Sequence, residues 1–196
     1  MKSGKNYSTL IVLLICVVCL LSCCAVVCVG AGGLVIYRNF SRFEAGDEYA
    51  VYGSVEEGDE APDFELQTLD GETLALRNLR GGPVVLSFGA SWCPPCRREV
   101  SMLQELHETY PDLFVLLVDI GEDYWTVQDF AADYGLSFTV ALDEDEAVAI
   151  DYGIYGIPAL FFIDDLGQVQ ALSVGAPKYR ELEGYLELIG IETGGW

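Results

Sequence analysis

Basic residues and histidine are scarce in this chain, and their scarcity excludes one class of partner. The 196 residues contain 10 Lys and Arg against 31 Asp and Glu, with a single histidine. Affinity for a phosphate backbone requires a basic surface, so nucleic acid is excluded. Residues 1–40 hold three bases and no acid, whereas residues 41–196 hold seven bases and every acid, a formal charge of −24. The composition therefore separates an apolar N-terminal segment from one acidic globular domain.

Charge is absent altogether from residues 10–37. As a helix this run would extend about 42 Å, more than the roughly 30 Å of a hydrocarbon core. We therefore expect residues 1–37 to form a single-pass signal anchor with one transmembrane helix. Lys2 and Lys5 precede the run. The positive-inside bias therefore predicts a cell-membrane protein with its acidic domain extracytoplasmic.

A lipid anchor is the alternative for the same segment. Residues 20–23, Leu-Leu-Ser-Cys, resemble a lipobox, and Cys23 would then become the lipidated first residue. The residues after Cys23 remain apolar, however, where a polar tether would be expected. Five cysteines lie in this segment and are expected to act as small apolar residues, with a dimer seam, acylation or a thiol relay as alternatives: Cys16, Cys19, Cys23, Cys24 and Cys28.

The remaining chain divides into an acidic tether at residues 38–60 and a domain at residues 61–192. Apolar periodicity and turn residues predict strands that alternate with helices and a hairpin at each end, around Asp70-Gly71 and Leu166-Gly167. This pattern predicts an α/β fold with a mixed sheet. The expected strands are 64–67, 72–76, 83–89, 113–120, 138–142, 159–164 and 168–174, and the expected helices are 97–110, 124–134, 144–152 and 178–189.

Cysteine is sparse in the acidic domain, where only Cys93 and Cys96 remain. They lie between an expected buried strand at 83–89 and an expected amphipathic helix. Unpaired backbone N–H groups and the helix dipole lower the pKa of a thiol at such a helix N-terminus. Arg97 and Arg98 add positive charge, and we expect Cys96 to be the more buried of the pair.

The scarcity of ligands also decides what this pair does. A structural zinc site takes about four ligands, and the domain has two Cys and one His. An inert disulfide between Cys93 and Cys96 would close too small a loop to constrain the chain. A redox-active dithiol is the remaining interpretation, supported by the strand, turn and helix around the motif. The acidic run 143–146 is expected to be a solvated helix start, with a cation site as the alternative.

Residues 83–99, PVVLSFGASWCPPCRRE, resemble the active-site strand and helix of thioredoxin-fold proteins. The resemblance is to the membrane-anchored TlpA/ResA-like thiol–disulfide oxidoreductases of the redoxin family. It runs from about Ala61 to Gly190 and includes Ala61-Pro62-Asp63-Phe64 and Gly156-Ile157-Pro158. It implies a thioredoxin fold, with a central mixed sheet flanked by helices and an N-terminal β-hairpin extension.

The resemblance also implies roles for individual residues. Cys93 would be the nucleophile and Cys96 the resolving thiol, joined as a redox disulfide when oxidised. Glu99 would tune the thiol pKa or transfer protons. Ser87 stands where thioredoxins keep a buried Asp, so Glu99 would be the only ionisable group there. The residues implied to bind substrate, with Pro158 as a cis-proline, are Trp92, Pro94, Pro95, Ile157 and Pro158.

The implied reaction is thiol–disulfide exchange without a metal or cofactor. The substrates would be disulfides of exported proteins, with apocytochrome c as the leading example, and a membrane thiol carrier would be the electron donor. A disulfide oxidase or isomerase is an alternative. A peroxiredoxin-like thiol peroxidase is another, because the motif at residues 61–64 occurs in both groups. A Pro-x-x-x-Thr-x-x-Cys pattern, which that chemistry needs, is absent before Cys93.

Overall fold

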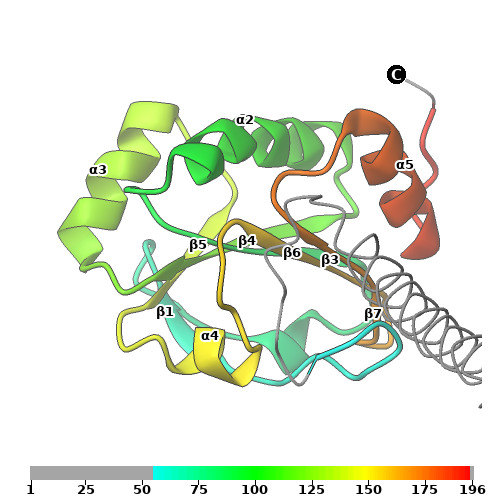
Figure 1. Cartoon of the computed structure of the whole chain (residues 1–196), viewed down its shortest axis with the longest axis horizontal. Coiled ribbons are helices and arrows are strands. Elements are labelled where there is room, and N and C mark those ends of the chain that lie inside the picture. Colours follow the sequence, from blue (N-terminus) through cyan, green and yellow to red (C-terminus); the bar gives the residue numbers. More distant parts are fainter. Residues whose placement is uncertain (1–54, 195–196) are drawn as a thin grey trace, which may run out of the picture. The chain divides into compact units, whose positions relative to one another are not determined.

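The computed structural model describes residues 55–194, which form one sheet with helices on both faces (Figure 1). The strands are β1 Glu65–Thr68, β2 Thr73–Ala75, β3 Val84–Gly89, β4 Phe114–Ile120, β5 Thr139–Asp143, β6 Ala159–Ile163 and β7 Val169–Val174. The helices are η1 Leu76–Leu79, α2 Pro94–Thr109, α3 Tyr124–Tyr134, α4 Ala147–Asp151 and α5 Tyr179–Leu188, where η1 is a 3-10 helix.

The expected membrane anchor falls in a part of the chain that the structure does not describe. Residues 10–37, Cys23 and the other N-terminal cysteines lie outside the described residues. Within residues 55–194, no helix is both long enough and apolar enough to cross a membrane. The anchor and its lipidated alternative therefore stay predictions.

The sheet is mixed, as the alternation of strands and helices predicts. Its strand order is β2-β1-β5-β4-β3-β6-β7. The three central strands β3, β4 and β5 are parallel, and β6 runs antiparallel to β3. The hairpin of β1 and β2 turns at Asp70-Gly71, where Gly71 has a φ of +80° that suits glycine. The expected α/β thioredoxin-like fold and its N-terminal hairpin extension are therefore confirmed.

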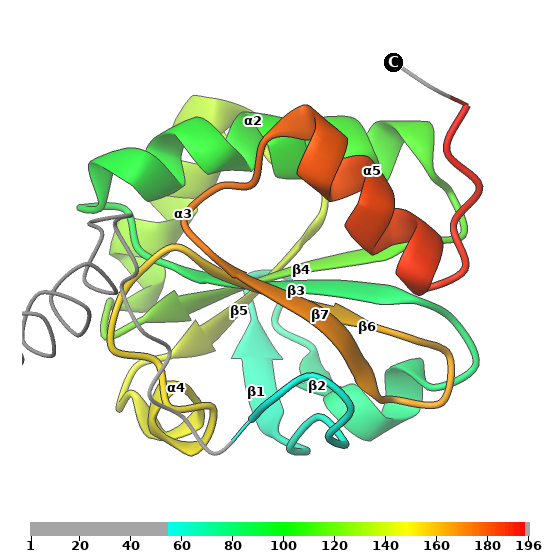
Figure 2. The same cartoon turned by 45° about the vertical axis from the view of Figure 1, so that its right-hand side comes forward.

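The helices form two layers, with α2, α3 and α5 on one face of the sheet and α4 on the other (Figures 1 and 2). Successive side chains of a strand point to opposite faces. In β3, Val85 packs in the cluster under α2, whereas Leu86 and Phe88 pack in the cluster beside α4. Ser87 consequently faces α2, and a side chain at Gly89 would do so as well. This alternation determines which residues approach the cysteines.

Two boundaries differ from those expected. Helix α4 begins at Ala147, because the side chain of Asp143 accepts hydrogen bonds from the N–H groups of Val148 (3.1 Å) and Ala149 (2.8 Å). Asp143 is buried, so the solvated interpretation of the acidic run is wrong for this residue. Residues 55–60, which were assigned to the tether, pack on the domain. Val55 is buried, and Glu60 forms an isolated β-bridge with Gln168, the residue before β7.

Candidate active site

The two cysteines lie at the first turn of α2, directly after the buried strand β3. Cys93 is the N-cap of the helix, and Pro94 and Pro95 occupy its first two positions, where a missing N–H costs nothing. Cys93 and Cys96 form a disulfide with their Cα atoms 5.2 Å apart. The N–H of Cys96 donates to Cys93 Sγ at 3.2 Å. The helix N-terminus thus directs a backbone donor at the sulfur, which would stabilise a thiolate there.

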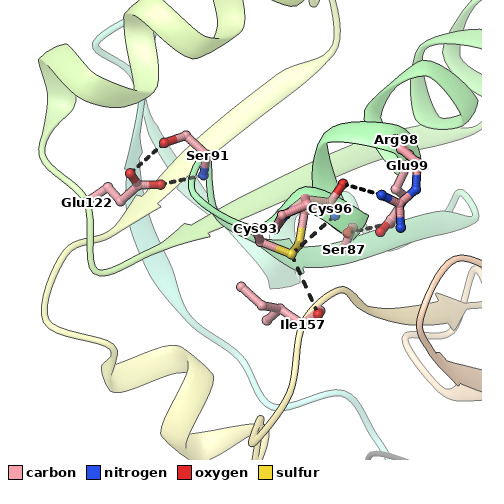
Figure 3. The surroundings of a disulfide bond; sticks show 9 residues. Ser87, Ser91, Cys93, Cys96, Arg98, Glu99, Glu122 and Ile157 are labelled. Carbon is pink, nitrogen blue, oxygen red and sulfur yellow. Dashed lines mark hydrogen bonds between the residues drawn. A yellow bond between two sulfur atoms is a disulfide. The ribbon is translucent and has the colours of Figure 1, made fainter. Parts of the chain in front are cut away.

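The loop before β6 covers this disulfide (Figure 3). The carbonyl oxygen of Ile157 lies 3.6 Å from Cys93 Sγ, and the Ile157–Pro158 peptide bond is cis, as the resemblance implies. Both cysteines are buried, with 3% of Cys93 and 4% of Cys96 exposed. The two cysteines are therefore equally buried in the disulfide form, whereas Cys96 was expected to be the more buried, because the Ile157 loop covers Cys93.

The residues that flank Cys93 are open to a partner. Trp92 is 64% exposed, Pro94 is exposed and Pro95 is half-buried. Arg97 and Arg98 are both exposed, and Arg98 donates to the carbonyl oxygen of Pro94 at 3.1 Å. The positive charges expected beside the motif are therefore on its solvent side, where water screens them.

Glu99 lies under the disulfide, on the face of α2 that packs on the sheet. It is buried, and its Oε1 accepts a hydrogen bond from Ser87 Oγ at 2.8 Å, whereas its Oε2 has no partner. Burial raises the pKa of Glu99 to about 8, and the Ser87 hydrogen bond opposes that rise. Glu99 is thus a carboxyl group that stays protonated at neutral pH beside the cysteines.

A second buried acid, Asp119, was missed by sequence reasoning. It is the penultimate residue of the apolar strand β4 and the register partner of Gly89, so it shares the α2 face with Ser87. Burial, followed by the charge of Glu122, raises the pKa of Asp119 to about 8. The expectation that Glu99 is the only ionisable group near the site is therefore wrong. The signal that could have identified Asp119 is an acid within the otherwise apolar run 113–120.

Two exposed aromatic residues near the site were also missed. Tyr155, 75% exposed, precedes Ile157 in the loop that covers the disulfide. Trp125, 71% exposed, is the second residue of α3 and follows Glu122, whose carboxylate accepts a hydrogen bond from Ser91, by three residues. Single large apolar side chains at the start of a helix or in a loop are common on surfaces, so only their placement near Cys93 singles them out.

This arrangement defines a class of protein. A mixed sheet, a disulfide at the N-terminus of the helix after its central strand, and a cis-proline loop against that disulfide together make a thioredoxin-like thiol–disulfide oxidoreductase. The chain belongs to the AhpC/TSA family, whose model matches residues 57–172. In the described part of the chain, no cluster of three or more His, Cys, Asp or Glu residues could hold a metal ion.

Known proteins of this kind resemble the chain over most of their length. Thioredoxin-like protein YneN of Bacillus subtilis (strain 168) is 34% identical over 164 residues, which cover 82% of this chain and 91% of YneN. Thiol-disulfide oxidoreductase ResA of Bacillus thuringiensis (strain Al Hakam) is 33% identical, covering 82% and 89%.

Solved structures agree with these sequence relatives. A Chlorobium tepidum protein described as a thiol:disulfide interchange protein DsbE superposes with a TM-score of 0.65 and 32% identity, covering 70% of this chain and all of that one. StoA from Bacillus subtilis superposes with a TM-score of 0.56 and 25% identity, covering 64% and 96%. Enzyme class and fold thus agree with the geometry of the cysteine pair.

Proposed function

We propose that the protein reduces disulfides of exported proteins at the outer face of the cytoplasmic membrane, with apocytochrome c before haem attachment as the leading substrate. Two features of the chain support this setting. The uncharged residues 10–37 are long enough to tether the domain, and the bases before them favour a cytoplasmic N-terminus. The ResA-like resemblance supports the substrate class, and ResA is among the relatives of the chain.

The chemistry is a two-electron exchange between Cys93, Cys96 and a substrate disulfide. The Cys93 thiolate attacks one substrate sulfur, which forms a mixed disulfide and releases the other substrate sulfur as a thiolate. The Cys96 thiolate then attacks Cys93 Sγ and releases the second substrate thiolate. The substrate gains two electrons and the protein is left with its Cys93–Cys96 disulfide. A dithiol carrier in the membrane would restore the reduced protein by the same exchange in reverse.

The observation that carries the reducing direction is the buried carboxyl Glu99 beside Cys96. A strongly oxidising site stabilises its thiolate, because this favours the reduced form of the protein. Here the Cys96 N–H and the helix N-terminus favour a thiolate, whereas Glu99 opposes one when it ionises, near and above pH 8. In that range the reduced form is less stable than in a site with the helix alone, so the protein gives up electrons more readily.

Substrate contact is assigned to the rim around Cys93. Trp92, Pro94 and Pro95 provide exposed apolar surface on one side of the disulfide. Ile157 and Pro158 lie on the other side, where backbone groups before β6 would pair with an extended segment of the substrate. The exposed ring of Tyr155 extends this rim, and aromatic side chains are frequent anchors in protein interfaces.

Trapping of the mixed disulfide tests this function. In membranes, a full-length Cys96→Ser protein is expected to accumulate disulfide-linked partners, because no resolving thiol remains. A Cys93→Ser protein is the matched control, since it keeps one thiol in the motif but loses the proposed nucleophile. Mass spectrometry of the Cys93-linked partners should identify exported proteins that contain cysteine pairs. Trapping by Cys93→Ser instead, or by neither variant, would contradict the proposal.

A thiol peroxidase is the second candidate, because the family that matches the chain is AhpC/TSA. Peroxide consumption by the full-length protein, lost in Cys93→Ser, would favour it over the reductase. We expect peroxide consumption to be slow compared with reduction of a protein disulfide. The threonine position of the peroxidase pattern is occupied by Ala90, and the hydroxyls of Ser87 and Ser91 donate to Glu99 and Glu122 rather than to a cysteine.

A further inference from the structure

Asp119, the penultimate residue of β4, carries a buried carboxyl that the dithiol chemistry does not use. The residue is fully buried, and neither of its oxygens has a hydrogen-bond donor among the residues that the structure describes. An ionised carboxylate without a donor is costly in such a place. Asp119 does not belong to the dithiol, and it caps no helix. Its buried position therefore calls for an account of its own.

The position of Asp119 relates it to both cysteines. Its register partner on β3 is Gly89, and a Cβ placed on Gly89 would lie 3.6 Å from Cys96 Sγ. Asp119 therefore lies on the strand next to the residue, Gly89, that packs against Cys96. The same Cβ would lie 3.3 Å from Leu117 Cδ1, so Gly89, Leu117 and Cys96 pack closely at this point.

Glu122 lies in the loop that follows β4, and its charge and hydrogen bonding add to the rise in the pKa of Asp119. The carboxylate of Glu122 also accepts two hydrogen bonds from Ser91, one from the backbone N–H at 2.5 Å and one from the hydroxyl at 2.7 Å. Ser91 immediately precedes Trp92 and Cys93. Figure 3 shows the Ser91–Glu122 contact on one side of the disulfide and Glu99 on the other.

We propose that Asp119 is a positioning residue for the redox site: its protonated carboxyl donates to Glu122, and Glu122 in turn holds the loop that presents Trp92 and Cys93. The single proton lets two carboxyl groups lie together without repulsion. The pKa of Asp119, raised to about 8 by burial and by Glu122, is consistent with a protonated form at neutral pH. Loss of the proton would leave two negative charges, push Glu122 away and release Ser91.

The other titratable groups around Asp119 do not remove this effect. The titratable side chains on the buried face of α2 are Cys96 and Glu99, and burial raises the pKa of Glu99 to about 8. At the start of α3, the hydroxyl of Tyr124 donates to the carbonyl oxygen of Leu69 at 3.2 Å. The neighbours of Asp119 on β3 and β5 are Gly89 and Leu142, which carry no charge.

The test is the pH profile of Cys93 alkylation in the reduced full-length protein, followed by mass spectrometry of the Cys93 peptide. A Glu99→Gln background removes the other buried carboxyl. In that background, Asp119 should slow alkylation above pH 8, where its charge disfavours the thiolate and its loop loosens. Asp119→Asn keeps a donor for Glu122 and adds no charge, so its rate at pH 9 should be roughly threefold to tenfold higher. Glu144→Gln removes an exposed acid at the same edge of the sheet and should change nothing.

Glu122→Gln provides a second variant in case Asp119→Asn does not fold. Without the charge of Glu122, the inflection caused by Asp119 should move to lower pH. Identical profiles for the background, Asp119→Asn and Glu122→Gln would overturn the proposal. The inference rests on the proposed nucleophilic role of Cys93, but alkylation requires no protein substrate. A failure to trap partners would therefore contradict the proposed function, whereas unchanged pH profiles would contradict only the role of Asp119.

Discussion

The hydroxyl of Ser87 donates a 2.8 Å hydrogen bond to Oε1 of Glu99, across the interface between β3 and α2 beneath the disulfide. This contact gives a buried acid one donor and leaves its second oxygen without a partner. A carboxyl in that condition is easier to bury with its proton than without it. The pair therefore keeps an uncharged acid beside Cys96 at neutral pH and a charged one in alkaline solution.

Replacement of Glu99 by Gln should change the pH dependence of the reduced dithiol. Above pH 8 the wild-type carboxylate disfavours a thiolate, so Cys93 of Glu99→Gln should react with iodoacetamide roughly threefold to tenfold faster at pH 9. Near pH 6 the two rates should be equal, because Glu99 is protonated. Glu108→Gln is the control, since Glu108 is an exposed acid on the same helix. Equal rates for wild type and Glu99→Gln at pH 9 would remove Glu99 from the account.

Replacement of Ser87 by Ala should raise the pKa of Glu99 above its value of about 8. The hydroxyl of Ser87 stabilises the carboxylate, and its loss leaves burial unopposed. Carbon-13 NMR of the Glu99 side-chain carboxyl, assigned by its absence in Glu99→Gln, measures the midpoint. A lower midpoint in Ser87→Ala would mean that water or another donor replaces the hydroxyl.

Stability should also report these buried acids. The folded-state pKa values of Glu99 and Asp119 are raised to about 8, so their stabilising contribution is complete below the unfolded pKa values. It is lost as pH rises toward 8, by about 1.4 kcal/mol per pH unit for each group. Relative to wild type, Glu99→Gln should therefore gain roughly 2–4 kcal/mol of unfolding free energy between pH 5 and pH 8.

Urea unfolding of the oxidised full-length protein in detergent, followed by circular dichroism, measures this difference. Glu108→Gln again serves as the control. The carboxylate of Glu108 is exposed, so its replacement should change the unfolding free energy equally at pH 5 and pH 8. The same offset between wild type and Glu99→Gln at pH 5 and pH 8 would show that Glu99 is ionised in the folded protein at both pH values.

The exposed aromatic rim should matter for protein substrates and not for small ones. Trp92→Ala and Tyr155→Ala are each expected to lower the rate of exchange with a protein disulfide roughly tenfold, as for a moderate interface anchor. Their rates with oxidised glutathione should stay close to wild type, because a small disulfide needs little of this surface. Leu166→Ala is the control, since Leu166 is 67% exposed in the turn between β6 and β7, at the opposite end of β6. Equal losses on both substrates would indicate a disturbed dithiol instead.

Much of the fold could be predicted from the sequence, because its signals are local. The uninterrupted apolar runs at 83–89 and 113–120 predict the buried parallel strands β3 and β4. Gly135 ends α3 with a φ of +63°, as a glycine after the last helical residue suggests. The strand, turn and helix around Cys93 and Cys96 also place the cysteines at a helix N-terminus. Glu99 and the Ile157-Pro158 loop could be assigned to the site only because the motif order resembles a known family.

The remaining features depend on contacts between distant segments. Ser87 and Glu99 are 12 residues apart, and they meet only because alternation in β3 points Ser87 toward α2. Asp119 reads as one polar residue at the end of an apolar run until β4 is placed beside Gly89. Asp143 is likewise buried because its carboxylate accepts hydrogen bonds from two backbone N–H groups of α4. Sequence periodicity locates such strands without giving the face on which each polar side chain lies.

The redox potential of the Cys93–Cys96 couple distinguishes a reductase from an oxidase. It is measured on the full-length protein at pH 7 by equilibration with a thiol–disulfide buffer, with the Cys93 peptide quantified by mass spectrometry. A reductase should have a potential near or below the value of about −270 mV of thioredoxin. A potential close to the value of about −120 mV of DsbA would contradict a reducing role and favour an oxidase.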